Sequence, residues 1–244
     1  MLPLTNMLTE LRLSGFKQHL DSLEAQAIEK QWSHHDFLAK LCEQELAQRY
    51  QTRVNSWRKE SALNIAKSLN NLDLSVYKAE VSQRIEKLQG DTRWAKQASN
   101  VILFGPSGVG KSHLANGLGL KLIDEGIRVK YFTGIGLVQQ LQQAKSRLEL
   151  TAFMSKFDRY SVIIIDDIGY VKKTESETSV LFELIAHRYE SASLIITSNQ
   201  PFSQWDSIFP DSMMTVAAVD RLVHHATIIG IEGESYRSKQ KAKD

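Results

Sequence analysis

The sequence of 244 residues contains a single cysteine, Cys42, so no intrachain disulfide can form. It has no run of 18 apolar residues and no basic flank followed by an apolar segment at its start, and therefore neither a membrane span nor a secretory signal is expected. The net charge of +2 is too small to indicate nucleic-acid binding by itself, and it does not exclude such binding. No internal repeat and no low-complexity segment is present. With a hydrophobic fraction of 42%, these features predict a globular protein of the cytoplasm.

The chain changes its pattern along its length. Residues 1–68 show helical periodicity with almost no glycine or proline after Gly15, and Ser33 with Asp36 resembles a capping box before a long helix. A short amphipathic segment ending at Gly90 follows. From residue 100 onward, apolar runs alternate with helical patterns, which is typical of a parallel α/β sheet. The expected strands are 101–104, 129–132, 161–165, 194–197 and 227–231, and the expected helices are 111–125, 136–147, 149–158, 174–190 and 215–224. We therefore expect a helical domain over 1–68 and an α/β domain over 69–244.

A glycine-rich loop joins the first of these strands to a helix. Gly105 to Ser112 match the phosphate-binding pattern G-x-x-x-x-G-K-[ST]. Glycine lets the backbone approach a polyanion, Lys111 supplies charge for the β- and γ-phosphates, and the hydroxyl of Ser112 is a natural Mg²⁺ ligand. The pattern predicts ATP or ADP with Mg²⁺ as ligands. The residues expected to bind nucleotide are Gly105, Pro106, Ser107, Gly108, Val109, Gly110, Lys111, Ser112 and His113.

Two later strands also end in polar side chains. Asp166 and Asp167 close one apolar run, and Asn199 follows another. Because the carboxyl ends of parallel strands meet at one edge of a sheet, these side chains should lie beside the loop. We expect Asp166 in the Mg²⁺ shell, reached through water or Ser112, and Asp167 as the group that polarises the attacking water. Asn199 can hold a water or the γ-phosphate, since an amide both donates and accepts.

Arg221, in the segment before the last strand, has two interpretations. It either neutralises charge at a nucleotide held by a neighbouring subunit or pairs with Asp220 or another acid. The adjacent His224 and His225 offer no metal-binding spacing with each other or with Cys42, and we expect a structural role. Trp94 either lines an adenine pocket or belongs to the core.

A basic tract with a nearby aromatic residue lies in the first domain. Arg49, Arg53 and Lys59, close to Trp57, have the composition of a contact to a phosphate backbone. A solvated helix face is the alternative, which Glu43, Glu45 and Glu60 support. Further on, two helices, 136–147 and 149–158, are expected between the strands 129–132 and 161–165. A simple crossover between parallel strands needs only one helix, so the chain carries an inserted helix.

These motifs together resemble an AAA+ ATPase of the initiator and helicase-loader branch, and more specifically the IstB family of ATP-dependent helpers of transposition. The resemblance spans nearly the whole chain, and its combination of motifs is specific although the phosphate-binding loop alone is not. The segments that carry it are NVILFGPSGVGKSHLANGLG at 100–119, DDIGY at 166–170, HRYE at 187–190, TSN at 197–199, DRLVHHA at 220–226 and GESYR at 233–237.

This resemblance implies an α/β fold with an AAA+ P-loop core, a five-stranded parallel sheet of order 5-1-4-3-2, a small all-α N-terminal domain and no C-terminal lid domain. It implies Lys111, Asp167, Asn199 and Arg221 as catalytic residues, with Arg221 acting across a subunit interface. Ser112 stands where the family commonly has threonine, which keeps the hydroxyl, and Asp167 shortens the usual glutamate by one methylene. The inserted helices would face DNA through Lys145, Arg147 and Lys156.

The implied partners are duplex DNA bound with low sequence specificity, a transposase of the same mobile element, and further copies of the chain with nucleotide at their interfaces. No membrane is expected, and the location would be the bacterial cytoplasm, with the nucleoid when DNA is bound. The alternative within the same fold is a replicative helicase loader. A small-molecule kinase would share the loop and the acidic strand end, but it would need an acceptor pocket and a lid and would not need Asn199 or Arg221. A nucleotide-gated scaffold with negligible turnover has the Asp167 substitution as its only indication.

Overall fold

The computed structural model describes residues 3–169, 174–201, 204–205 and 212–233. The chain forms two compact units, Met1–Trp57 and Arg58–Asp244. The first unit contains α1 (Leu4–Glu10), α2 (Ser14–Glu29) and most of α3 (His34–Ser61). The predicted cap precedes α3, because the backbone N–H of Asp36 donates to the hydroxyl of Ser33 at 3.1 Å. The N-terminal unit is therefore helical throughout its described length.

A buried carboxylate organises this first unit. Glu45 of α3 accepts hydrogen bonds from the backbone N–H of Gly15 at 2.6 Å and from Nε of Arg49 at 2.7 Å. Burial opposes the ionisation of Glu45, but the bonds from Arg49, Gly15 and Phe16 outweigh it and hold its pKa below the ordinary value. The packing of α2 on α3 thus depends on a charged pair as well as on apolar contacts.

The two compact units divide inside α3, after Trp57. The last turn of this helix forms side-chain pairs within the second unit. Arg58 forms an ion pair with Asp124 at 2.5 Å, and Glu60 pairs with Arg128 at 2.6 Å and accepts a hydrogen bond from Tyr160 at 2.8 Å. These pairs tie the end of α3 to the α/β unit, and the helical periodicity continues through the division.

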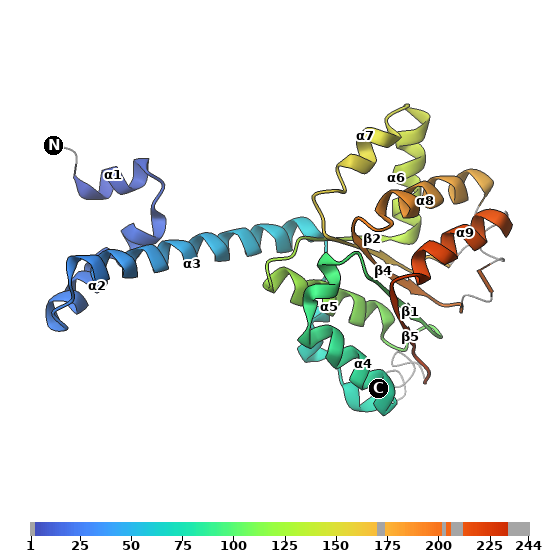
Figure 1. Cartoon of the computed structure of the whole chain (residues 1–244), viewed down its shortest axis with the longest axis horizontal. Helices are drawn as coiled ribbons and strands as arrows, with labels where there is room; N and C mark the ends of the chain where they lie inside the picture. The colour runs from blue at the N-terminus through green and yellow to red at the C-terminus, as the bar shows by residue number, and fades with distance from the viewer. Residues whose placement is uncertain (1–2, 170–173, 202–203, 206–211, 234–244) are drawn as a thin grey trace, which may run out of the picture. The chain divides into compact units, whose positions relative to one another are not determined.

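The second unit is built on a parallel sheet (Figure 1). Its order is β2-β3-β4-β1-β5, which confirms the predicted order 5-1-4-3-2. The strands are β1 (Asn100–Phe104), β2 (Val129–Thr133), β3 (Val162–Asp166), β4 (Ser193–Ser198) and β5 (Ala226–Gly230). The helices that follow β1 to β4 are α5 (Lys111–Asp124), α6 (Gly134–Ser146), α7 (Leu150–Ser155), α8 (Glu175–Arg188) and α9 (Ser212–Val223). The inserted helix is therefore present as α7.

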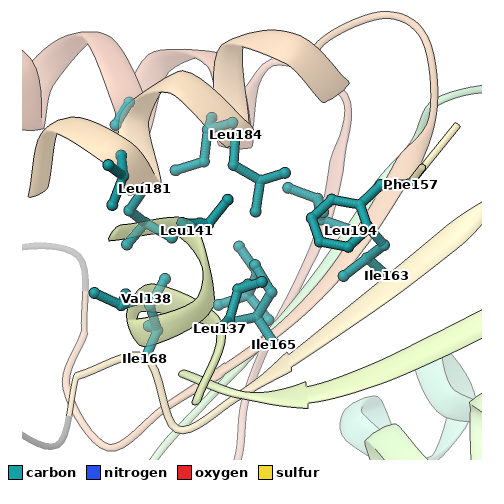
Figure 2. Packing of buried hydrophobic residues seen from close by; sticks show 14 of the residues in the cluster. Leu137, Val138, Leu141, Phe157, Ile163, Ile165, Ile168, Leu181, Leu184 and Leu194 are labelled. Atoms are coloured by element: carbon teal, nitrogen blue, oxygen red, sulfur yellow. The ribbon is translucent and has the colours of Figure 1, made fainter. Parts of the chain in front are cut away.

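Both faces of the sheet are covered, which explains why its central strands are apolar at successive positions. Ile163 and Ile165 of β3 face a cluster with Leu141 of α6 and Leu184 of α8 (Figure 2). Ile164, between them in the chain, points to the other face, where its Cδ1 lies beside Gly119 of α5. Ile163, Ile164 and Ile165 are all fully buried.

The segment between α3 and β1 consists of short 3₁₀ helices and one α-helix. It contains η1 (Ile65–Lys67), η2 (Leu69–Asn71), η3 (Leu74–Val76), α4 (Ala79–Gly90) and η4 (Thr92–Lys96). The helix α4 ends at Gly90 as predicted, while the four 3₁₀ turns have no periodic signal in the sequence. In the part of the chain that the structure describes, no helix is both long and apolar enough to cross a membrane.

Candidate nucleotide-binding site

The loop from Gly105 to Gly110 has a backbone that only glycine adopts easily. Gly105, Gly108 and Gly110 have φ angles of 147°, 87° and 99°. A Cβ on Gly105 would collide with the carbonyl oxygen of Ile231, and one on Gly110 would collide with the hydroxyl of Tyr77. Gly110 is the N-cap of α5, so the loop leads directly into the N-terminus of a helix. This is the backbone cradle expected for an anionic phosphate chain.

Lys111 opens α5 and turns back over the loop. Its Nζ donates to the carbonyl oxygens of Gly105 at 2.8 Å and Pro106 at 2.7 Å, and the residue is buried. The ammonium group is therefore held at the glycine loop by two of the loop's own carbonyl oxygens.

The segment before α4 also reaches the loop, which the sequence did not indicate. The buried Tyr77 donates its hydroxyl to the carbonyl oxygen of Val109 at 3.1 Å. Nε2 of His113 lies 2.8 Å from the carbonyl oxygen of Ser68, and Asn116 accepts from the backbone N–H of Asn64 at 3.0 Å. The loop and the first turns of α5 are therefore supported from outside the sheet.

Asp166 is the last residue of β3, and both oxygens of its carboxylate accept a hydrogen bond. The hydroxyl of Thr197 donates to Oδ1 at 2.5 Å, and that of Tyr131 donates to Oδ2 at 2.7 Å. Burial and this hydrogen bond to Asp166 raise the pKa of Tyr131 above its ordinary value. Tyr131 therefore remains a neutral donor, and Asp166 keeps one orientation. Neither donor was assigned a role from the sequence, although a threonine directly after the apolar run Leu194 to Ile196 is a signal that could have shown one of them.

Asp167 leaves the sheet in a constrained conformation. Its φ is 63°, in the left-handed region, and its backbone N–H donates to the hydroxyl of Thr197 at 2.8 Å. The residue is exposed, in contrast to the buried Asp166. Strained backbone of this kind is concentrated at functional sites. The two acids therefore separate into a buried oxygen donor and an exposed carboxylate, as successive positions of a strand end require.

The predicted residues of this edge lie together by topology. β1, β3 and β4 are parallel neighbours, with Phe104 paired to Ser198 and Ile165 to Ile196. The glycine loop, the two acids and Asn199 follow the carboxyl ends of these strands, and Asn199 is exposed. Ser112 and Asp166 supply the oxygen donors that Mg²⁺ prefers, so the residues present suit that ion.

Arg221 lies at the opposite edge. It is near the end of α9, and the adjacent Leu222 accepts a hydrogen bond at 3.0 Å from the side chain of Asn100, the first residue of β1. Its guanidinium lies 5.2 Å from the ring centroid of Phe182 and donates to the carbonyl oxygen of Ala217 at 2.9 Å. Within the described residues it forms no ion pair, so the predicted pairing with an acid is absent there. Leu222, next to Arg221, thus lies beside the amino end of β1, whereas the glycine loop follows the carboxyl end of that strand.

The structure also describes the surroundings of Trp94 and of the two adjacent histidines. Trp94 lines a pocket of 390 Å³ with residues such as Arg84, Lys87 and Thr227 beside the edge strand β5, and it is half-buried. His224 and His225 lie with Glu190 so that one ligand atom from each falls within 4.8 Å of the others, a grouping that adjacency in sequence had not indicated.

The basic residues differ in their surroundings. Nζ of Lys145 pairs with Glu183 at 2.8 Å and thereby ties α6 to α8. Arg49 is paired with Glu45, and the guanidinium of Arg53 lies 5.5 Å from the ring centroids of both Tyr50 and Trp57. The three remaining candidates, Lys59, Arg147 and Lys156, are exposed. Two cations of the basic tract in α3, Arg49 and Arg53, are thus already engaged by side chains of their own unit.

Comparisons with known proteins agree with this site. Residues 6–244 match the family model described as IstB-like ATP binding protein. The chain is 42% identical over 233 residues to an insertion sequence ATP-binding protein of Sinorhizobium fredii, covering 96% of this chain and 78% of the relative. It is 35% identical over 237 residues to an ATP-binding protein of insertion sequence IS21 from Pseudomonas aeruginosa, covering 97% and 89%.

Solved structures resemble about two thirds or more of this chain in fold. AMPPCP-bound DnaA from Aquifex aeolicus gives a TM-score of 0.58 at 18% identity, covering 75% of this chain and 56% of that one. The DnaC helicase loader gives 0.54 at 21% identity, covering 66% and 97%. Two of the segments that carry the resemblance lie partly outside the described residues. These are DDIGY, whose last residue is Tyr170, and GESYR, from Glu234 onward. The sheet order and the loop are those of an AAA+ P-loop fold, and the chain belongs to the family of IstB-like ATP-binding proteins.

Proposed function

We propose that this protein is an ATP-hydrolysing AAA+ regulator that assembles on duplex DNA and activates or targets the transposase of its mobile element. The observation that carries the proposal is the division of the catalytic groups between two edges of one sheet. Lys111, Asp166 and Asp167 follow the carboxyl ends of the strands, while Arg221 lies at their amino ends beside Asn100. A complete site then needs two copies of the chain. Relatives described as insertion sequence ATP-binding proteins supply the link to transposition.

Each residue has a distinct task in this proposal. The backbone N–H groups of the loop bind the phosphates, and Lys111 exchanges the carbonyls of Gly105 and Pro106 for phosphate oxygens. Ser112 and Asp166 hold Mg²⁺, which neutralises phosphate charge when bound. Asp167 accepts a proton from the attacking water, Asn199 orients that water, and Arg221 of a neighbouring copy stabilises the charge that develops on the γ-phosphate. The shorter carboxylate of Asp167 implies slow hydrolysis.

A helicase loader is the alternative with the same fold. The resemblance to DnaC and DnaA lies below 25% identity and concerns the fold alone. The family match extends from residue 6 to residue 244 and so includes the N-terminal unit. That unit is where a loader and a transposition helper would differ in partner. We therefore favour the transposase, and co-purification of the full chain with either partner separates the two functions.

The shared site is tested by mixing two inactive variants. Lys111→Ala should lose ATP binding. Arg221→Ala should still bind ATP, but its assembly on DNA and its hydrolysis of ATP should both be impaired. In a mixture of equal amounts, roughly a quarter of the interfaces would combine an intact loop with an intact arginine by random assortment. ATPase activity and particle size on duplex DNA should then recover in part.

The control is a mixture of Lys111→Ala with the double variant Lys111→Ala/Arg221→Ala, which can form no intact site. Recovery in the first mixture alone supports the proposal. An Arg221→Ala protein that assembles and hydrolyses ATP like the wild type contradicts it, because the arginine would then have no task across an interface.

A further inference from the structure

The turn after α8 and the turn after α9 carry side chains that can bind a metal ion. Helices α8 and α9 pack side by side (Figure 1). Glu190 belongs to the first turn, and His224 and His225 form the second. One ligand atom from each of these residues lies within 4.8 Å of the others, and no other three side chains of this kind are grouped so closely among the residues that the structure describes.

The turn between α9 and β5 brings the two histidines together. Successive side chains diverge in a strand and in a helix, but here the ring centroids of His224 and His225 are 4.2 Å apart. The hydroxyl of Tyr189 lies 3.2 Å from Nδ1 of His224. A hydrogen bond to one ring nitrogen orients the imidazole, as is usual for histidines that bind metal. The pair therefore has the arrangement of two ligands to one ion.

Buried hydrogen bonds hold the backbone of both turns. Arg188, two residues before Glu190, is buried, and its guanidinium donates to carbonyl oxygens of neighbouring segments, among them that of Ser193 at 3.2 Å. In the other turn, the carbonyl oxygen of His225 accepts from the backbone N–H of Asn100, the first residue of β1, at 2.7 Å. The three candidate ligands are thus exposed side chains on a fixed backbone, and rotation of these side chains alone would close them around an ion.

The donor atoms indicate which ion suits this group. Two imidazoles and one carboxylate suit Zn²⁺, whose tetrahedral sites have ligand atoms roughly 3.4 Å apart. Mg²⁺ and Ca²⁺ prefer sites made of oxygen ligands alone. Among the described residues, no lysine or arginine forms an ion pair with Glu190, so its carboxylate is available. The group therefore favours a transition metal over the cation expected at the glycine loop.

We propose that Glu190, His224 and His225 bind one Zn²⁺ ion, which joins the turn after α8 to the turn after α9. Because all three side chains are exposed, a water molecule would fill the fourth position. The ion would link segments that are far apart in the sequence, and its role is structural. It would also fix the end of α9, where Arg221 lies three residues before His224. The site does not depend on the proposed function.

The test is a titration of Zn²⁺ into the untagged, metal-free full chain, with excess Mg²⁺ present to fill sites made of oxygen ligands. Competition with a chromophoric chelator measures affinity and stoichiometry. The wild-type chain should bind one Zn²⁺ ion, and its Tm should rise when the ion is present. Glu190→Gln and His225→Gln should each weaken binding by a factor of about ten or more and lose the rise in Tm, because each removes one of three ligands. Without metal, both variants should unfold at the wild-type Tm, since the replaced side chains are exposed.

The double variant His34→Gln/His35→Gln is the matched control. These histidines are also adjacent and exposed, and Nδ1 of His35 lies 3.9 Å from Oδ1 of Asp36, but they belong to no group of three ligands among the described residues. The double variant should bind Zn²⁺ as the wild type does. Failure of the wild-type chain to bind Zn²⁺, or wild-type affinity in Glu190→Gln and His225→Gln, contradicts the site. A thiolate charge-transfer band in the Co²⁺-substituted chain also contradicts it, because the ion would then lie at the exposed Cys42.

Discussion

At the scale of single residues, Thr197 connects the parts of the candidate site. Its hydroxyl donates to the carboxylate of Asp166 and accepts from the backbone N–H of Asp167. Its own carbonyl oxygen accepts from Ile168 at 3.0 Å, and it lies two positions before Asn199. One side chain therefore fixes both acids relative to β4, the strand that Asn199 directly follows. Thr197 acts through these acids as a positioning residue.

We expect Thr197→Val to reduce kcat for ATP hydrolysis about tenfold to a hundredfold. The valine keeps the shape but loses a hydrogen bond to a charged group, which is worth about 1.5–3 kcal/mol. KM for ATP should change little, because Thr197 does not contact the glycine loop. Steady-state ATPase assays with DNA measure both constants.

Thr151→Val, at an exposed position of α7, is the control and should behave as wild type. Tyr131→Phe removes the other donor to Asp166 and should also lower kcat. Wild-type turnover in the Thr197→Val protein would show that the orientation of Asp166 does not depend on this bond.

At the scale of elements, close backbone contact joins α2 to α3. A Cβ on Gly15 would lie 2.7 Å from Cα of Glu45 and 2.9 Å from the carbonyl oxygen of Gln44. The same approach allows the N–H of Gly15 to reach the buried carboxylate of Glu45. A glycine is therefore required at position 15 because the backbones of α2 and α3 approach closely there. Helical periodicity does not reveal this role.

We expect Gly15→Ala to lower the free energy of unfolding of the first unit by about 1–3 kcal/mol, because α2 must move away from α3. Alanine would otherwise stabilise a helix interior. Gly90→Ala is the control, since a Cβ there meets nothing within 4 Å at the end of α4. Urea unfolding followed by helical circular dichroism compares the two. A Gly15→Ala protein as stable as Gly90→Ala would show that the helices tolerate a wider spacing.

At the scale of the whole molecule, binding to DNA would be an assembly property to which each copy contributes a few phosphate contacts. The inserted pair α6–α7 and its ends carry three exposed cations, Lys145, Arg147 and Lys156, of which Lys145 is paired with Glu183. Because neutralised phosphates release counterions, the salt dependence of binding counts such contacts. The three cations are therefore distinguishable by experiment although they are close in sequence.

Arg147→Gln and Lys156→Gln should each reduce the slope of log K against log salt concentration by about 1 per binding unit. Lys145→Gln should change the slope less, because its ammonium group already has a carboxylate partner. Fluorescence anisotropy of labelled duplex DNA over a range of salt concentrations measures the slopes. Equal slopes for wild type, Arg147→Gln and Lys156→Gln would place the DNA contacts elsewhere on the chain.

Local rules made much of the fold predictable. Five apolar runs, separated by helical patterns, indicate five strands, and the glycine spacing in Gly105–Ser112 indicates a phosphate cradle. The order of the strands came from the family resemblance and was confirmed. Such features depend on residues within a few positions of one another, so the sequence displays them directly.

The sequence by itself therefore determined the elements, the loop and the identity of the acids at the strand ends. Tertiary structure decided which distant side chains meet: Tyr77 on the loop, Tyr131 and Thr197 on Asp166, and Glu60 on Arg128. It also placed Arg221 at the edge away from its own loop. Contacts of this kind arise from packing between segments tens of residues apart, and no periodicity within one segment records them.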